Sequence, residues 1–186
     1  MKILLLGGGA REHAIAWALN RSPKVEALFA APGNPGIARF GRCFPIDPCD
    51  SAAVLDLVRA TGADSVVAGP EAPLVAGVAD VLREANVPVF GPGKDGAMLE
   101  GSKAFAKRFM ERHGIPTAPF DIVFDMEQAE AALRKRTPPY VVKADGLAAG
   151  KGAFLPDTLE EALEICRRLL IEGELKEAGN TLVVED

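Results

Sequence analysis

Short apolar runs alternate with amphipathic stretches along the first half of the chain, and this alternation constrains the fold more than any other feature. The apolar runs predict buried strands at Lys2–Leu6, Val25–Ala30, Ser65–Ala68 and Val87–Phe90. The stretches between them predict helices at Ala10–Arg21 and Leu74–Asn86, and a third helix that Asp50 or Ser51 caps and that runs to about Thr61. Strands that alternate with helices form parallel sheets covered by helices. We therefore predict an α/β domain with an open parallel sheet over residues 1–100.

The second half of the chain has a different order of elements. Ser102 is a good N-cap for a helix that ends near His113 and Gly114. Further strands are predicted at Ile122–Phe124, Tyr140–Lys143, Gly152–Leu155 and Thr181–Val184. Further helices are predicted at Met126–Arg136 and, capped by Asp157 or Thr158, through about Glu172. We expect a linker helix region over 101–122 and an α+β lobe over 123–186. Because the last strand is followed by no closing element, we expect a longer protein that is cut inside this lobe.

Composition and charge narrow the classes of function. The net charge of -5 argues against a nucleic-acid surface. No apolar run reaches the length of about 18 residues that a membrane-spanning helix needs. Cys43, Cys49 and Cys166 have neither zinc spacing nor a paired framework, so we expect no metal site and a reducing, cytoplasmic location. A metal pair of Cys43 and Cys49 is the alternative.

A glycine-rich segment between two predicted strands carries the clearest functional signal. Lys143 ends the first strand, and the loop after it contains Gly146, Gly150, Lys151 and Gly152. Glycines let backbone N–H groups approach phosphate oxygens, and lysines neutralise their charge. The segment therefore predicts a nucleotide triphosphate site in which Lys143 and Lys151 act as catalytic cations.

This loop differs from the Walker A loop of P-loop NTPases. The spacing from Gly146 to Gly150 is too short, and Gly152 stands where that loop has a metal-binding hydroxyl. Pro156 prevents a helix from continuing, so we predict a hairpin between strands. A plain glycine-rich turn with solvated lysines is the alternative.

The turn after the first strand, Gly7-Gly-Gly9-Ala-Arg-Glu12, is similar to a dinucleotide fingerprint with one departure. Glu12 occupies the position of the third glycine, where a carboxylate would repel a pyrophosphate. NAD binding is therefore disfavoured. Arg11 near a helix N-terminus could still receive a single phosphate group, and a merely structural turn is the other reading.

Two further loops follow strands at the carboxyl edge of the predicted sheet. They are Gly33-Asn-Pro-Gly36 and Gly69-Pro-Glu-Ala-Pro73. Loops at that edge line the ligand crevice of open α/β sheets. A rigid turn would hold Glu71 where it could bind an amine or a hydroxyl, and His13 could point into the same crevice. Turn chemistry alone would also explain these prolines and glycines.

Several motifs in order resemble one family, and the resemblance spans the whole chain. They are Gly7-Gly-Gly-Ala-Arg-Glu-His-Ala14, Ala31-Pro-Gly-Asn-Pro-Gly36, Gly69-Pro-Glu-Ala-Pro-Leu74, Leu99-Glu-Gly-Ser-Lys-Ala-Phe105, Gly114-Ile-Pro-Thr117 and Lys143-Ala-Asp-Gly-Leu-Ala-Ala-Gly-Lys-Gly152. This set resembles the phosphoribosylamine–glycine ligase (glycinamide ribonucleotide synthetase) family of ATP-grasp enzymes in purine biosynthesis. The resemblance implies a Rossmann-like substrate domain, a linker helix and the first lobe of an ATP-grasp fold.

The resemblance also implies roles for individual residues. Lys103 and Lys143 would contact ATP, the loop containing Gly146, Gly150, Lys151 and Gly152 would cover its phosphates, and Glu185 would contact the nucleotide. Asp186 stands where the family usually has glutamate. The crevice of the first domain would hold 5-phosphoribosylamine, through Gly9, Arg11, Glu12, His13, Asn34, Gly36, Pro70 and Glu71. The family's Mg²⁺ ligands and most of its glycine site lie downstream, so no metal ligand is expected in this chain.

The implied reaction joins glycine to 5-phosphoribosylamine with ATP, through a glycyl phosphate, in an intact enzyme that we expect to be a monomer. We expect the 186-residue chain alone to be inactive. An ATP-grasp ligase for another carboxylate and amine is one alternative. A non-catalytic nucleotide- or metabolite-binding module is the other.

Overall fold

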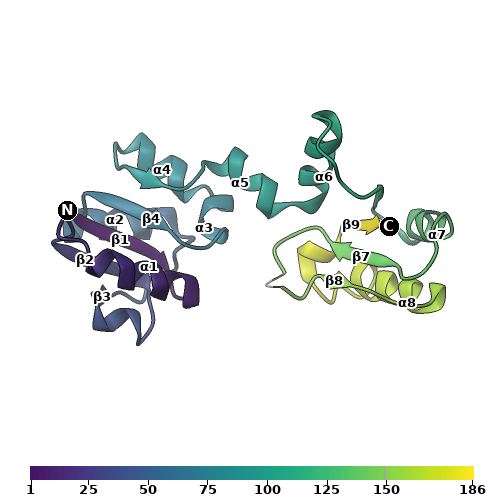
Figure 1. Ribbon diagram of the computed structural model, residues 1–186, viewed down its shortest axis with the longest axis horizontal. Coiled ribbons are helices and arrows are strands. Elements are labelled where there is room, and N and C mark those ends of the chain that lie inside the picture. The colour runs from purple at the N-terminus through teal and green to yellow at the C-terminus, as the bar shows by residue number, and fades with distance from the viewer. Residues whose placement is uncertain (149) are drawn as a thin grey trace. The chain divides into compact units, whose positions relative to one another are not determined.

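The chain folds into two compact units, Met1–Ala97 and Met98–Asp186, each with its own sheet (Figure 1). The computed structural model describes residues 1–148 and 150–186. The predicted fold class is confirmed, because the first sheet is parallel and the second is a mixed lobe of antiparallel strands and helices. The predicted division into 1–100, 101–122 and 123–186 stays a prediction.

A parallel sheet in the order β3-β2-β1-β4-β5 forms the first unit. Its strands are β1 (Lys2–Gly7), β2 (Ala27–Pro32), β3 (Arg42–Cys43), β4 (Ser65–Ala68) and β5 (Val89–Phe90). In the central strand β1, Leu4, Leu5 and Leu6 are at most 1% exposed. A strand that is apolar on both sides needs cover on both faces of its sheet.

Helices supply this cover on the two faces of the first sheet. Leu5 packs with Ala16 of α1 (Ala10–Asn20) and with Ile37 of the 3-10 turn η1 (Ile37–Arg39). Leu4 and Leu6 point to the opposite face, where they pack against α2 (Ser51–Thr61) and α4 (Val78–Glu84). The predicted cap of α2 is confirmed, since the Asp50 carboxylate accepts hydrogen bonds from the amides of Ala52 and Ala53.

Some elements differ from the sequence prediction. The predicted helix Leu74–Asn86 is two helices, α3 (Ala72–Val75) and α4, because Gly77 between them has a φ of +89°, which a right-handed helix cannot include. The short strand β3 and the helix α5 (Lys94–Gly101) were not predicted. Neither is long enough or periodic enough to give a clear hydrophobic pattern.

The second unit contains a four-stranded antiparallel sheet in the order β6-β9-β7-β8. Its strands are β6 (Phe120–Val123), β7 (Val141–Ala144), β8 (Ala153–Phe154) and β9 (Leu182–Glu185). The predicted hairpin around the glycine-rich loop is confirmed, because β7 and β8 pair with Lys143 opposite Ala153. Ala149 within this loop lies outside the described residues.

Two helices cover one face of this second sheet. They are α7 (Met126–Leu133) and α8 (Leu159–Leu170), and their apolar sides pack on Val142, Leu182 and Val184. Since side chains alternate along a strand, Glu185 points to the opposite face. There it meets Lys107 of α6 (Lys103–Arg112). The short turn η2 (Lys176–Gly179) precedes β9.

Candidate functional site

In the first unit, the loops that follow β1, β2 and β4 are bonded to one another at the carboxyl edge of the sheet. The amide of Gly33 donates to the carbonyl of Gly7 at 3.2 Å. The side-chain amide of Asn34 donates to the carbonyl of Gly8 at 2.9 Å. Asn34 Oδ1 accepts from the amide of Ile37 at 2.9 Å, which fixes the orientation of the Asn34 side chain. Three of the predicted loops therefore share this edge of the sheet, as the parallel topology requires.

Arg11 and Glu71 lie together at the same edge. Arg11 Nη1 donates to the carbonyl of Gly69 at 2.8 Å and is 3.6 Å from Glu71 Oε2. The side chain of Arg11 is 65% exposed, so it can still receive an anion from solvent. Pro70 lies against the turn at Gly7.

Glu12 and His13 face different surroundings from Arg11. Glu12 is 4% exposed, and its carboxylate accepts a hydrogen bond from the amide of Gly9 at 2.7 Å. It therefore caps its own helix, and its charge is directed at backbone N–H groups. The ring of His13 lies against Gly36, with its centroid 5.8 Å from that of Phe40. The roles of Glu12 and His13 as substrate contacts stay predictions.

In the second unit, two predicted lysines lie at the base of the glycine hairpin. Lys143 is near the end of β7, and Lys103, the first residue of α6, donates from Nζ to the carbonyl of Gly146 at 3.3 Å. Lys151 is exposed beyond the turn, where its amide donates to the carbonyl of Ala148 at 2.9 Å. Lys151 thus lies on the returning arm of the hairpin, next to Gly152, whose carbonyl is bonded to the amide of Ala144.

The backbone of the hairpin is open at Gly150 and closely packed at Gly152. Gly150 has a φ of +82°, and no heavy atom lies within 4 Å of the position that a Cβ would take there. Gly152, by contrast, is buried and forms the return of the hairpin, where its carbonyl accepts from the amide of Ala144 at 2.7 Å. A loop with an open backbone and nearby lysines fits phosphate oxygens.

Glu185 joins Lys143 to a further lysine that was not predicted. Lys143 Nζ is 2.8 Å from Glu185 Oε1, and Lys107 Nζ is 2.8 Å from Glu185 Oε2. We call these three side chains the ion cluster. Burial alone would raise the pKa of the Glu185 carboxyl, but the hydrogen bonds and charges of the two lysines outweigh it and lower that pKa. The carboxylate is therefore ionised, and each of its oxygens pairs with one lysine.

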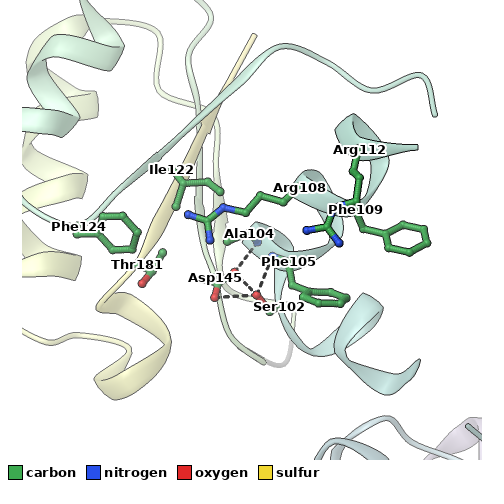
Figure 2. Close-up of a pocket in the computed structure, with 10 residues that line it drawn as sticks. All are labelled: Ser102, Ala104, Phe105, Arg108, Phe109, Arg112, Ile122, Phe124, Asp145 and Thr181. Atoms are coloured by element: carbon green, nitrogen blue, oxygen red, sulfur yellow. Dashed lines mark hydrogen bonds between the residues drawn. The ribbon is translucent and has the colours of Figure 1, made fainter. Parts of the chain in front are cut away.

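Asp145, which sequence reasoning also missed, ties the hairpin to α6. Its carboxylate accepts from Ser102 Oγ at 3.0 Å and from the amide of Ala104 at 2.6 Å (Figure 2). Ser102 Oγ in turn accepts from the amide of Phe105, which confirms its predicted capping role. The backbone carbonyl of Asp145 accepts from the amide of Lys103 at 3.2 Å. The first turn of α6 is thus capped by a residue from a distant loop.

A cavity of about 380 Å³ lies beside this cap, between α6 and the sheet (Figure 2). Arg108 extends into it toward Ile122, whereas Phe109 and Arg112 lie farther along the helix. Its residues are Ser102, Ala104, Phe105, Arg108, Phe109, Arg112, Ile122, Phe124, Asp145 and Thr181. It contains none of the residues that were predicted to bind ATP.

Simple spacing could have revealed both missed residues. Lys107 follows Lys103 by one helical turn, so the two share a helix face. Asp145 follows Lys143 with one residue between them, so their side chains point to the same side of the extended chain. In each case the spacing places the residue beside a predicted lysine, but its role depends on partners far along the chain.

In residues 1–148 and 150–186, no group of three or more His, Cys, Asp or Glu side chains could hold a metal ion. Within the same residues, no helix combines the length and the apolar character that crossing a membrane requires.

Family models match the chain from end to end. The model described as phosphoribosylglycinamide synthetase, N domain, matches residues 1–100. The model described as phosphoribosylglycinamide synthetase, ATP-grasp (A) domain, matches residues 101–186.

Individual relatives agree with the family models. The phosphoribosylamine–glycine ligase of Streptomyces coelicolor is 51% identical over 92% of this chain and 42% of its own length. The crystal structure of the phosphoribosylamine–glycine ligase from Thermotoga maritima has a TM-score of 0.83 and 35% identity, covering 100% of this chain and 44% of that one. The biotin carboxylase domain of the Hydrogenobacter thermophilus 2-oxoglutarate carboxylase, in complex with MgADP, shares the fold, with a TM-score of 0.77 at 22% identity over 99% of this chain and 43% of that one. The chain thus spans less than half the length of these relatives. Matched by both family models over its whole length, it belongs to the phosphoribosylglycinamide synthetase family.

Proposed function

We propose that this chain forms part of a phosphoribosylamine–glycine ligase, which joins glycine to 5-phosphoribosylamine and converts ATP to ADP and phosphate. The observation that carries the proposal is the placement of Lys103 and Lys143 at the base of the glycine hairpin, in a chain of this family. Lysines and open backbone amides at one loop suit a triphosphate. The bound ADP in the Hydrogenobacter relative supports the same ligand class.

The proposed chemistry proceeds in two steps. A carboxylate oxygen of glycine attacks the γ-phosphorus, the bond to the β-phosphate oxygen breaks, and ADP leaves. The amine of 5-phosphoribosylamine then attacks the carbonyl carbon of glycyl phosphate, loses a proton, and expels inorganic phosphate. The residues of this chain would orient the phosphates, offset their charge through Lys143, Lys103 and Lys151, and exclude water with the hairpin.

The crevice of the first unit is the proposed site for the sugar amine. Arg11, exposed beside the N-terminus of α1, would receive the phosphate group, and Glu71 would bind the amine or a ribose hydroxyl. Gly9, Asn34, Gly36 and Pro70 would form the walls. Glu12 and His13 are proposed as further contacts to the substrate in the same crevice.

Magnesium belongs to the proposal only as a partner of the nucleotide. Among the described residues no group of three or more His, Cys, Asp or Glu side chains could hold a metal ion, so the metal would arrive with the nucleotide. We also propose a monomeric enzyme in a reducing cytoplasm, which the free thiols of Cys43, Cys49 and Cys166 support.

The test uses a chain of the relatives' full length in which residues 1–186 keep this sequence, for example joined to the remainder of the Streptomyces relative. ADP release should require both glycine and 5-phosphoribosylamine, and other carboxylates and amines should not replace them. Lys143→Ala should lower kcat/KM for ATP by about a hundredfold, because it removes a cation aimed at the phosphates. The matched control is Lys135→Ala, an exposed lysine of the same unit, which should keep the parental value. ADP release that is indifferent to the amine would refute the assigned substrate.

A further inference from the structure

The ion cluster contains a lysine whose charge is almost entirely removed from solvent. Lys107 is 7% exposed and Glu185 is 6% exposed, whereas the side chain of Lys143 is 30% exposed. Buried charges are tolerated only when they are paired and hydrogen-bonded. Lys107 is therefore not a surface cation, and its burial must be compensated by the groups around it.

Lys107 is held by several groups besides Glu185. Its ammonium donates to Thr117 Oγ1 at 2.7 Å and to the carbonyl of Ala118 at 3.3 Å. It also lies 5.5 Å from the centroid of the Phe120 ring. Together with Glu185 these contacts fix the ammonium in place. Lys143 has more freedom, because it is partly exposed and the salt bridge to Glu185 holds it from one side.

The charges of the cluster determine what it can offer to an anion. Lys107 and Lys143 with Glu185 carry one net positive charge. Without Lys107, the Glu185 carboxylate would cancel Lys143, and the pair would be neutral. Interactions between charges a few ångströms apart in a partly buried site are screened much less than in water. The presence of Lys107 thus decides whether Lys143 presents a net charge to a ligand.

We propose that Lys107 is a positioning residue for the nucleotide: it neutralises Glu185 from the buried side, so that Lys143 is free to bind the triphosphate. When phosphate oxygens arrive, Lys143 exchanges its bond to Glu185 for a bond to phosphate. Glu185 meanwhile keeps its partner Lys107, so no carboxylate is left unpaired. On this assignment Glu185 acts on the nucleotide through Lys143. The inference rests on the proposed ATP-dependent function.

The competing explanation is that Lys107 only fastens α6 to β9. Both explanations predict a loss of stability when Lys107 is replaced, since an unpaired buried carboxylate remains. They differ in the apparent affinity for ATP and in the effect of removing both charges. A structural fastener should not alter KM for ATP in molecules that are folded.

The experiment measures kcat, KM for ATP, KM for glycine and Tm in the full-length chain described above. Lys107→Met should raise KM for ATP about tenfold, or about 1.4 kcal/mol, and leave KM for glycine within twofold of the parent. The double variant Lys107→Met/Glu185→Gln removes both buried charges and leaves Lys143 cationic, so KM for ATP should return to within about threefold of the parent. Lys135→Met is the matched control, because it removes an exposed lysine that also pairs with a carboxylate, Asp121.

An unchanged KM for ATP in Lys107→Met, or a double variant that remains as impaired as the single one, overturns the proposal while the ligase function stands. If Lys107→Met does not fold, Lys107→Arg and the double variant decide the question. Both should keep KM for ATP within about threefold of the parent, and a tenfold rise in either overturns the proposal. A parent chain with no ATP turnover overturns the proposed function itself, and this inference with it.

Discussion

Replacing Asp145 by alanine should loosen the first turn of α6. The carboxylate accepts from Ser102 Oγ at 3.0 Å and from the amide of Ala104 at 2.6 Å (Figure 2). Both donors belong to residues that are at most 8% exposed, so water cannot easily replace the lost acceptor. Hydrogen bonds to a charged group contribute roughly 1.5–3 kcal/mol each, and bonds that share one carboxylate are not additive. We expect a local cost of about 2–3 kcal/mol.

Native-state hydrogen exchange of the 186-residue chain measures this cost at the relevant amides. The amides of Ala104 and Phe105 should exchange about 30- to 100-fold faster in Asp145→Ala, and Asp145→Asn should give an intermediate change. The matched control is Asp125→Ala, which removes the local cap of α7, bonded to the amide of Gln128 at 2.8 Å. Because that cap is exposed, its loss should cost about 1 kcal/mol. A cost for Asp145→Ala no larger than that of the control would refute the reasoning about a long-range cap.

Three further predictions concern other features of the fold. The pKa of Glu185 is lowered because its two lysines outweigh its burial, so its stabilising effect should be present above its ordinary pKa of 4.5 and disappear as the pH falls below that value. The free energies of unfolding of the parent and of Glu185→Gln, measured with urea at a series of pH values, should therefore converge at low pH. Burial raises the pKa of Cys166 to about 11, so a thiol reagent at neutral pH should modify the half-buried Cys43 in the native chain and Cys166 only after unfolding, which mass spectrometry can assign. Gly77→Ala should destabilise the first unit by roughly 1 kcal/mol in thermal unfolding, since alanine disfavours a φ of +89°; equal or greater stability would contradict a left-handed break between α3 and α4.

The sequence was sufficient for most of the fold because the strongest patterns are local. The predicted strand Ser65–Ala68 matches β4, and the capping residues Asp50, Ser102 and Thr158 mark helix starts as expected. These features depend on neighbouring residues alone, through periodicity and hydrogen bonds within one turn. The break at Gly77 was missed because a glycine inside an apolar pattern does not reveal its φ.

The candidate site was predictable only in part. Lys103 and Lys143 were found from the glycine loop and the family motifs, and both lie at the base of that hairpin. Lys107 and Asp145 were missed, because their importance comes from partners far along the chain. A lysine on an amphipathic helix usually lies on the solvent-exposed face. Lys107 is buried because β9 pairs in the centre of the sheet and so places Glu185 against it.

The position of β9 has a consequence for biosynthesis. Of the four described strands of this sheet, β9 leaves the ribosome last, yet it lies between β6 and β7, which are made much earlier. Until β9 is made, the backbone N–H and C=O groups of β6 and β7 that face it have no strand to pair with. The chain between β6 and β9 also has to close as a long loop before these bonds can form. The Met1–Ala97 unit has no such delay, since all five of its strands are already available. Nascent chains should therefore form the first unit before this sheet, and the Glu185 carboxylate should reach its two lysines only when β9 joins β6 and β7.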